Sequence, residues 1–524
     1  MMISSLKSFV GRQLSGVIRH PGRSPGPTFL VTALALAGLF SSQTAWAAGL
    51  KAGAARVEIT NTDAGPVNDP LYVKALVLKD DSTTAVLITL DAVAVGEIGH
   101  IKNDYLGKVR SRLKADLGIQ PESVLVNASH CHGVVCSDVD RRTVEAVQAA
   151  VRNLVPVSIG VGAGHENRVS ENRRLKLKSG KVIDSRHAYS LPPDDEVAEV
   201  GPIDPQIGIL RLDAADGRTV AVVYNFACHP ILGVPSKANT ADMTGFASQV
   251  IEDNSSEGTI ALFVQGCGGD INPALYKEVD SPRNAETLGN MLGLSTLKGL
   301  RKIKCQGAGP FKVIREMLSL PRADLAERII AQEAELQRLL QSLKGTSLNL
   351  KTFLPLAVKY GVSGEFPGNY SYRYLQEKMI GRDGLVKMDA ENRRNLEAYI
   401  ENIHIMEQLT RTQTNLALLK KHQADNVAAG KRTIDVEVMG LRIGDFVLVT
   451  FPGELTVQIG LNIKKTSPHK NTFVAGYTNG YIYYSPTAEQ LLNIGGAQED
   501  SDCILAPEWQ KSFEDKVAEL LKKL

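Results

Sequence analysis

The sequence lacks several features that would each assign a class of protein. Charge of one sign is not in excess, with 59 Lys and Arg against 57 Asp and Glu, so neither a nucleic acid nor an acidic polymer is expected as a partner. No two of the six cysteines form a C-x-x-C pair, which removes the usual signal for a structural zinc site. Internal repeats are also missing, and beyond the N-terminal region no apolar run is long enough to span a bilayer.

The composition that is present is that of an ordinary globular protein. Over 524 residues, 43% are hydrophobic and 22% are charged, which gives ample core-forming capacity. Apolar runs typical of buried strands recur along nearly the whole chain. We therefore expect one large α/β domain over residues 48–524, with a mixed β-sheet core flanked by helices.

The N-terminal region has the features of a signal peptide. Arg12, Arg19 and Arg23 precede the apolar stretch Phe29–Phe40, which is short for a membrane span. An A-x-A cleavage motif ends at Ala47. We expect residues 1–47 to be removed and the mature chain to be periplasmic or secreted; the alternative is an uncleaved membrane anchor.

Two histidines close the apolar run Val124–His132. The run is typical of a buried strand, and a period of two sends His130 and His132 to the same side if the extended conformation persists. Surface or core histidines are an equally common explanation of such a pair. The pair indicates a metal site only if further ligands join it.

Three later apolar runs also end in polar residues. Thr219–Phe226 leads to His229, Thr259–Val264 leads to a Gly-rich loop that contains Asp270 and Asn272, and Asp445–Thr450 leads to Glu454. Because ligands in open α/β sheets bind outside the carboxyl ends of strands, we expect these residues to share one crevice. Two His and a carboxylate are a common catalytic zinc set with an open position for water. The alternative is that each is an ordinary strand-to-loop junction.

Eight sequence blocks carry a resemblance to a known family. They are Val57–Thr60 (VEIT), Asp69–Leu78 (DPLYVKALVL), Asn127–Gly133 (NASHCHG), Asn225–Pro230 (NFACHP), Asp242–Ala247 (DMTGFA), Gln265–Pro273 (QGCGGDINP), Phe451–Glu454 (FPGE) and Asn479–Glu489 (NGYIYYSPTAE). In order and approximate spacing they resemble the neutral/alkaline (non-lysosomal) ceramidase family over most of the mature chain. The resemblance implies a divergent form of that family's N-terminal catalytic domain, without its C-terminal sandwich domain, for which the chain leaves no room.

The resemblance also implies the ligands of a single zinc ion. By motif these are His130, His229, Glu454 and a tyrosine of the NGYIYY block. Within that block the alignment favours Tyr484 over Tyr481 or Tyr483. A phenolate would supply negative charge that offsets Zn²⁺.

Substrate contacts are implied by the same resemblance. His132 is expected to face the substrate, and Arg173 to orient its carbonyl or stabilise an oxyanion, with Arg168 as the rival arginine. Asp242 is expected either beside a histidine ligand or as the cap of a helix that starts at Met243.

Asn272 departs from the family pattern. The family has a serine there, often assigned as the nucleophile or as a group that helps the zinc-bound water. Asparagine cannot form an acyl-enzyme by the serine route, but its amide can donate a hydrogen bond to a developing oxyanion. We therefore expect catalysis by a zinc-activated water, with Asn272 as a donor.

Four of the six cysteines lie on the expected site loops. They are Cys131, Cys136, Cys228 and Cys267. An even count in an exported chain permits disulfides, and buried small apolar side chains are the alternative. Thiolate ligands of zinc are a third alternative.

The pattern becomes helical between Lys312 and Arg432. Arg322–Lys344 and Glu391–Met406 each place apolar residues on roughly one helical face, and the residues Phe366–Tyr372 between them are typical of a loop. We expect a helical insertion over 312–432 whose helices cover a sheet face; the alternative is that they roof the crevice.

The sequence thus predicts an exported zinc-dependent amidohydrolase that resembles neutral ceramidase, with one zinc per chain. Its expected substrate is an N-acyl amide in ceramide or a related lipid amide, attacked by a zinc-activated water. The alternatives are a non-catalytic binding protein on the same scaffold and a zinc hydrolase of a different amide or ester. A lipid-like substrate also raises the expectation of peripheral membrane contact, whereas no protein partner is indicated.

Overall fold

The computed structural model describes residues 49–524 except residues 187, 279–281 and 308. These residues belong to one compact unit, which begins at Ala48. The expected signal peptide, residues 1–47, lies outside the described residues. No described helix combines the length and the apolar character needed to cross a membrane.

An eight-stranded mixed sheet forms one half of the core. In spatial order its strands are β12 (Ile260–Gln265), β11 (Thr219–Phe226), β10 (Gln206–Ala214), β5 (Val155–His165), β1 (Lys51–Glu58), β2 (Tyr72–Lys79), β3 (Thr84–Leu90) and β4 (Val124–Ala128). The pairs β11–β12 and β3–β4 are parallel and the others are antiparallel. β4 and β11 are buried along their whole length, as strands covered on both faces are, which explains their continuous apolar sequences.

A four-stranded sheet packs face to face against the eight-stranded sheet. Its spatial order is β14 (Phe311–Pro321), β15 (Thr433–Ile443), β16 (Phe446–Thr450) and β18 (Asn471–Ala475). The core between the sheets contains Leu76 and Leu210 from one side and Leu441 and Phe473 from the other. Gly208 permits this contact, since a Cβ there would lie 2.3 Å from the ring of Phe473.

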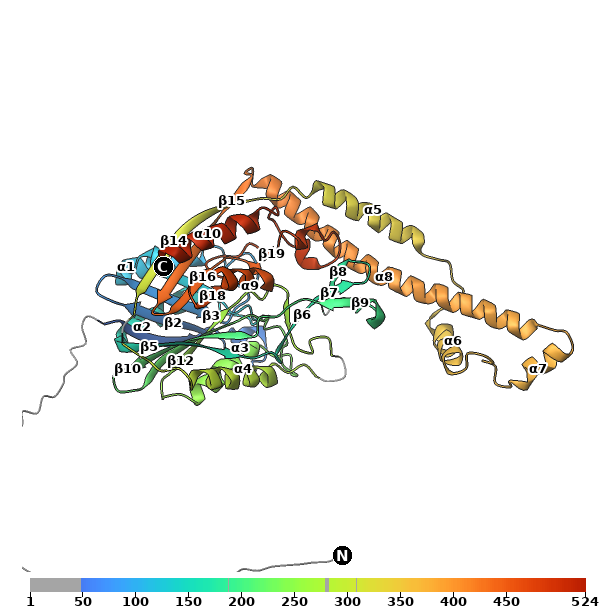
Figure 1. Ribbon diagram of the computed structural model, residues 1–524, viewed down its shortest axis with the longest axis horizontal. Coiled ribbons are helices and arrows are strands. Elements are labelled where there is room, and N and C mark those ends of the chain that lie inside the picture. The colour runs from blue at the N-terminus through green and yellow to red at the C-terminus, as the bar shows by residue number, and fades with distance from the viewer. Residues whose placement is uncertain (1–48, 187, 279–281, 308) are drawn as a thin grey trace, which may run out of the picture. The chain divides into compact units, whose positions relative to one another are not determined.

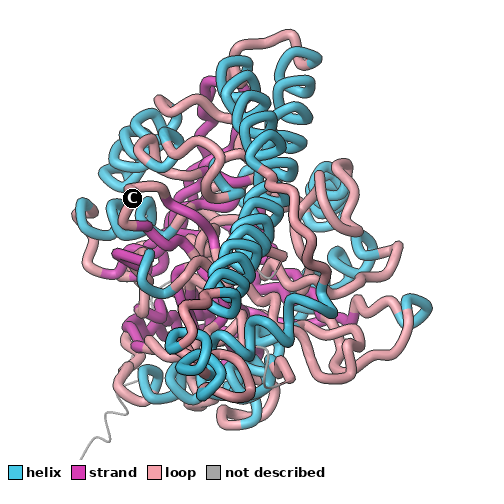
Figure 2. The backbone as a smooth tube through the Cα atoms, turned by 90° about the vertical axis from the view of Figure 1, so that its right-hand side faces the viewer, coloured by secondary structure: helices cyan, strands magenta, loops and turns pink. Residues whose placement is uncertain are grey.

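Helices cover the outer faces of both sheets. The eight-stranded sheet is covered by α1 (Tyr105–Leu117), α2 (Val139–Arg152), α3 (Asp242–Asp253) and α4 (Ala285–Leu300), and the four-stranded sheet by α9 (Val457–Thr466) and α10 (Trp509–Lys523). The strands thus lie between layers of helices (Figures 1 and 2). This arrangement confirms the expected mixed sheet flanked by helices.

Three small sheets lie beyond the ends of the main strands. They are β13 (Ile271–Pro273) with β6 (Ser170–Asn172), β17 (Glu454–Leu455) with β19 (Tyr484–Ser485), and β8 (Val182–Asp184) with β7 (Arg174–Leu177) and β9 (Val197–Val200). Their registers place Asn272 opposite Glu171 and Glu454 opposite Tyr484. The first two sheets therefore fix residues from distant parts of the chain beside one another.

The expected helical insertion is present with different bounds and packing. Residues 311–321 form strand β14, and the helices are α5 (Ala326–Ser342), α6 (Leu350–Val362), α7 (Tyr372–Met379) and α8 (Gly384–Ala428). The predicted loop separates α6 from α7. The packing of α5, α6 and α7 is chiefly with the long helix α8, instead of with a sheet face as expected (Figure 1).

Candidate metal centre

Three residues predicted as ligands converge at one buried point. His130 follows β4, His229 follows β11, and Glu454 begins β17. One side-chain atom of each lies within 4.8 Å of the others, and all three side chains are buried. The Oε2 atom of Glu454 is 3.1 Å from His229 Nε2 and 3.6 Å from His130 Nε2. Neighbouring ligands of a tetrahedral zinc ion are separated by about 3.3 Å, so the residues present fit such an ion.

The hydrogen bonds of the two histidines fix which ring nitrogen faces Glu454. His130 Nδ1 is 2.6 Å from the carbonyl oxygen of Val93, and His229 Nδ1 is 3.1 Å from that of Ile271. A carbonyl oxygen only accepts, so each Nδ1 must carry the proton. In the neutral rings both Nε2 lone pairs then point toward a carboxylate, and a cation among the three atoms would satisfy all of them.

At neutral pH the two histidines and Glu454 are in the protonation states that bind a metal ion. Burial lowers the pKa of His130 to about 4 and also lowers the pKa of His229. Burial alone would raise the pKa of the Glu454 carboxyl, but the two histidines beside it hold that pKa well below its usual range. The site therefore offers two neutral imidazoles and one carboxylate, the forms that a metal ion requires.

Three tyrosines surround this cluster. Tyr477 donates to Glu454 Oε2 at 3.1 Å, and Tyr481 donates to Glu454 Oε1. Tyr484 lies differently, with its ring stacked at 6.5 Å on His229 and its hydroxyl 3.2 Å from Arg173 Nη2. Of the tyrosines weighed from the sequence, Tyr484 is the one that lines the cavity beside His130 and His229. Its role as a ligand stays a prediction.

Left-handed backbone occurs at His130 of the cluster and at several residues of the segments that pack near it. The described non-glycine residues with positive φ include His130 (70°), Asp242 (57°), Tyr477 (52°), Asn479 (61°) and Tyr483 (64°). Each such conformation costs about 1–3 kcal/mol and persists only where the surroundings impose it. β4 ends at Ala128, so the extended conformation assumed for His130 and His132 does not persist; the turn at His130 aims its ring at the cluster.

Arg173 is buried at the edge of the cluster and lines the cavity. Glu499 accepts from Arg173 Nε and, at 3.0 Å, from Arg186 Nη2. Burial alone would raise the pKa of Glu499, but the two arginines lower it to about 2. Arg168, the rival, is a largely exposed side chain that pairs with Glu166. The structure therefore brings Arg173, and not Arg168, to the site.

Other predicted site residues have different positions. His132 lines the cavity, with its ring centroid 5.7 Å from that of His130. Asn272 is fully buried, 3.5 Å from Arg173 Nη1, and is not among the residues that line the cavity. Asp242 accepts from the backbone N–H groups of Gly233 and Met243. Helix α3 begins at Asp242 itself, with Ala241 as its N-cap, so Asp242 does not cap a helix that starts at Met243. The Nδ1 atoms of His130 and His229 bond backbone carbonyls and not Asp242.

The Gly-rich loop after β12 packs tightly against the strand that carries Glu454. A Cβ at Gly269 would lie 2.6 Å from the carbonyl oxygen of Glu454. The carboxylate of Asp270 accepts from Val457 N at 2.8 Å, which ties the loop to the start of α9. The glycine and the aspartate of this loop therefore position the strand that carries Glu454.

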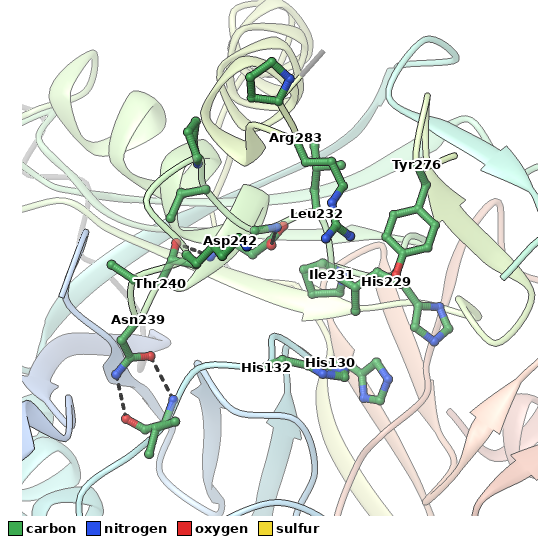
Figure 3. Close-up of a pocket in the computed structure, with 18 of the residues that line it drawn as sticks. His130, His132, His229, Ile231, Leu232, Asn239, Thr240, Asp242, Tyr276 and Arg283 are labelled. Atoms are coloured by element: carbon green, nitrogen blue, oxygen red, sulfur yellow. Dashed lines mark hydrogen bonds between the residues drawn. The ribbon is translucent and has the colours of Figure 1, made fainter. Parts of the chain in front are cut away.

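An open cavity of about 670 Å³ leads to the cluster. His130, His132, His229, Arg173, Arg186 and Tyr484 line one part, and Val134, Pro230, Ile231, Leu232, Val234 and Pro235 line another. Figure 3 shows the rings of His130 and His229 close together, with Tyr276 near His229. No described residue of α5–α8 contributes to the lining, so these helices do not roof the cavity.

All six cysteines lie among the described residues and none is bridged. Cys131, Cys228, Cys267 and Cys503 are buried. Of the three alternatives from the sequence, the structure shows small apolar side chains, buried at three of the four site-loop cysteines and partly buried at Cys136, without disulfides and without thiolates in the His–His–Glu cluster.

Some residues of the site carried no sequence signal. Tyr477, Glu499 and Arg186 reach it from segments whose sequence shows neither periodicity nor a ligand motif. Only the shared NGYIYY block pointed toward Tyr481. Contacts across the fold, which sequence spacing does not encode, bring these side chains together.

The fold is similar to that of solved ceramidase structures. Neutral ceramidase from Pseudomonas aeruginosa superposes with a TM-score of 0.57 at 16% sequence identity, over 91% of this chain and 75% of that chain. A ceramidase complexed with C2 gives a TM-score of 0.58 at 16% identity and the same coverage. No family model matches the sequence. The resemblance drawn from motifs is thus supported at the level of the fold.

Proposed function

We propose that this protein is a zinc-dependent hydrolase of N-acyl amides with a lipid-like acyl group. The observation that carries the proposal is the convergence of two Nε2 lone pairs and a carboxylate of Glu454 at the end of an open cavity. A ceramidase-like fold supports the amide as the bond that is cleaved. Export, as expected from the N-terminal region, is part of the proposal.

The metal would be held by His130, His229 and Glu454, with Tyr484 as the fourth candidate ligand. When bound, Zn²⁺ lowers the pKa of a coordinated water and polarises a carbonyl. The Tyr477 and Tyr481 hydroxyls hold the carboxylate of Glu454 in place. Together with the carbonyl partners of the two histidines, these bonds orient all three candidate ligands.

The rest of the cavity supplies substrate contacts. Arg173, held by Glu499, presents its guanidinium where it can donate to the acyl oxygen. His132 is exposed to the cavity and can exchange a proton with the leaving amine. The apolar wall that includes Ile231, Leu232 and Val234 offers a surface for an alkyl chain.

Metal analysis and a substrate panel test the proposal. The purified chain should contain about one zinc per molecule and should hydrolyse at least one of an N-acyl sphingoid base, an N-acyl ethanolamine or an N-acyl amino acid. A chelator should abolish this activity, and added Zn²⁺ should restore it. His130→Ala combined with His229→Ala should strip the metal, whereas the exposed Glu257→Gln should leave it bound.

Three outcomes would contradict the proposal. Turnover that survives complete removal of the metal would refute a zinc-dependent reaction. A zinc-loaded chain that is inert on amides but binds them would favour the binding-protein alternative. Preferential cleavage of simple esters would favour a zinc hydrolase of another substrate class.

A further inference from the structure

Helix α6 is apolar on two opposite faces. Its inner face packs on α8 through Phe353, which stacks on Tyr399 at 4.6 Å, and through the buried Tyr360. Its outer face carries Leu350, Leu354, Val358 and Val362, which recur every four residues and are 53–83% exposed. The outer stripe therefore lacks a cover within the described chain.

The orientation of α6 and α7 is fixed by one buried carboxylate. Asp389 of α8 accepts from the Tyr360 hydroxyl at 2.7 Å and from the Tyr374 hydroxyl of α7 at 2.6 Å. These bonds hold both helices against the N-terminal half of α8 (Figure 1). The outer stripe cannot turn inward without breaking them.

The exposed apolar surface continues onto α7 and the start of α8. Met379 is 86% exposed, and Tyr372, Leu375, Ile380 and Val386 are each more than half exposed. We call the surface over residues 350–388 the helical tip. Its large exposed apolar side chains are contiguous, unlike the single apolar residues scattered over ordinary surfaces. Such contiguous patches mark interaction sites.

Basic residues lie among the apolar residues of the helical tip. Residues 350–388 contain six Lys or Arg and three Asp or Glu. Asp383 is neutralised by Lys387, and Glu377 accepts from the backbone of Leu385, whereas Lys351, Arg373 and Lys378 are exposed at the surface. The tip therefore combines apolar anchors with unbalanced positive charge.

We propose that the helical tip docks on an anionic lipid bilayer. Apolar side chains flanked by Lys and Arg are the composition of helices that lie in the membrane interface, where the apolar residues enter the acyl region and the cations meet anionic headgroups. A second copy fits the tip less well, because two-fold pairing would bring the same cations together. The inference goes beyond hydrolysis, since docking requires neither the metal nor turnover.

Vesicle co-sedimentation tests the proposal on the chain as purified. Vesicles of phosphatidylcholine are compared with vesicles in which about a third of the lipid is phosphatidylglycerol. The wild type should partition at least about tenfold more strongly to the anionic vesicles. Val358→Glu with Val362→Glu should remove most of this binding, whereas Leu294→Glu, an equally apolar and half-exposed position on α4, should not.

A charge variant and a sizing experiment complete the test. Lys351→Glu with Arg373→Glu should abolish the preference for anionic vesicles, while circular dichroism and zinc content stay those of the wild type. Vesicle binding that the tip substitutions leave unchanged would overturn the proposal. Binding through the N-terminal apolar segment would give this result. A dimer that the Val358→Glu/Val362→Glu variant converts to a monomer, without loss of vesicle binding, would assign the tip to a second copy.

Discussion

Glu454 pairs with Tyr484 across the two parallel strands β17 and β19. One backbone register thus sets both the carboxylate that faces two histidine lone pairs and the phenol that faces the cavity. Gly269 packs against the same strand, and Asp270 ties its loop to α9. The geometry of the centre therefore depends on backbone packing as much as on the ligands.

Glu454→Gln should weaken zinc binding by at least about tenfold, because the amide lacks the charge that the ion requires. Asn272→Ala should leave zinc binding close to that of the wild type, since Asn272 contacts Arg173 and not the cluster. Competition with a chromophoric chelator measures both affinities. Equal loss of metal in the two variants would show that the ligand assignment is wrong.

The metal-free protein should lose stability as the pH falls from about 6.5 to about 4. The pKa of His130 is about 4 in the folded chain, lowered by burial, so the unfolded chain binds the extra proton in this window. Protonation of His130 should lower the free energy of unfolding by at most about 3 kcal/mol. Urea titrations of the chelated protein should show this slope, and His130→Gln should flatten it. A slope that His130→Gln does not change would assign the pH dependence to other groups.

Arg173→Lys should lower kcat/KM by about 10²-fold on any substrate that the wild type hydrolyses. The lysine keeps the positive charge but lacks the planar fork of N–H donors that lets arginine bond Glu499 and the acyl oxygen at the same time. Arg168→Lys is the matched control, because its side chain is exposed and pairs with Glu166. A thermal melt separates a folding defect from a catalytic one. Equal activity of the two variants would exclude Arg173 from substrate contact.

Asn272→Ser should change kcat/KM by no more than about tenfold if a zinc-activated water is the nucleophile. The side chain is buried beside Arg173, which suits a positioning residue better than an attacking one. Steady-state kinetics on the best amide substrate provide the measurement. A wild type that is inert and a serine variant that is active would instead show that serine is the required nucleophile.

Gly269→Ala should reduce both stability and zinc affinity, because the added Cβ would collide with the backbone of the ligand strand. Gly107→Ala is the control: it lies in α1 with open space around the position, and should stabilise the protein by about 0.5–1 kcal/mol. Denaturant unfolding and chelator competition on both variants check the expectation. Wild-type zinc affinity in Gly269→Ala would show that the loop does not hold Glu454.

Strands with continuous apolar sequences were predictable from the sequence. β11 has the expected bounds, and β4 and β16 differ from the expected runs only at their ends. Burial on both faces leaves a strong signal of this kind. His130, His229 and Glu454 could be proposed as ligands because each follows such a strand.

Other features depend on contacts that the local sequence does not record. The left-handed backbone at His130 could not be predicted, because the residue there is not a glycine. Tyr477 reaches Glu454 from a turn, and Glu499 reaches Arg173 across more than 300 positions of sequence. The helical insertion expected from the sequence includes strand β14. The strand is mostly exposed, so its apolar residues give only a weak strand signal. Helix α6 was not predicted, because it contains Pro355 and has apolar residues on two faces. These features hide the helical period of its apolar residues.

The pairing of β14 with β15 runs from Phe311 opposite Ile443 to Pro321 opposite Thr433. The chain therefore leaves the four-stranded sheet and returns to it at adjacent positions. Helices α6 and α7 lie within this excursion, so their length and sequence can change without shifting the register of β16. Helix α8, in contrast, bonds Asp184 through Arg411 and Asp502 through His422. Lipid docking and bond cleavage would then be separable traits, free to diverge independently in related chains.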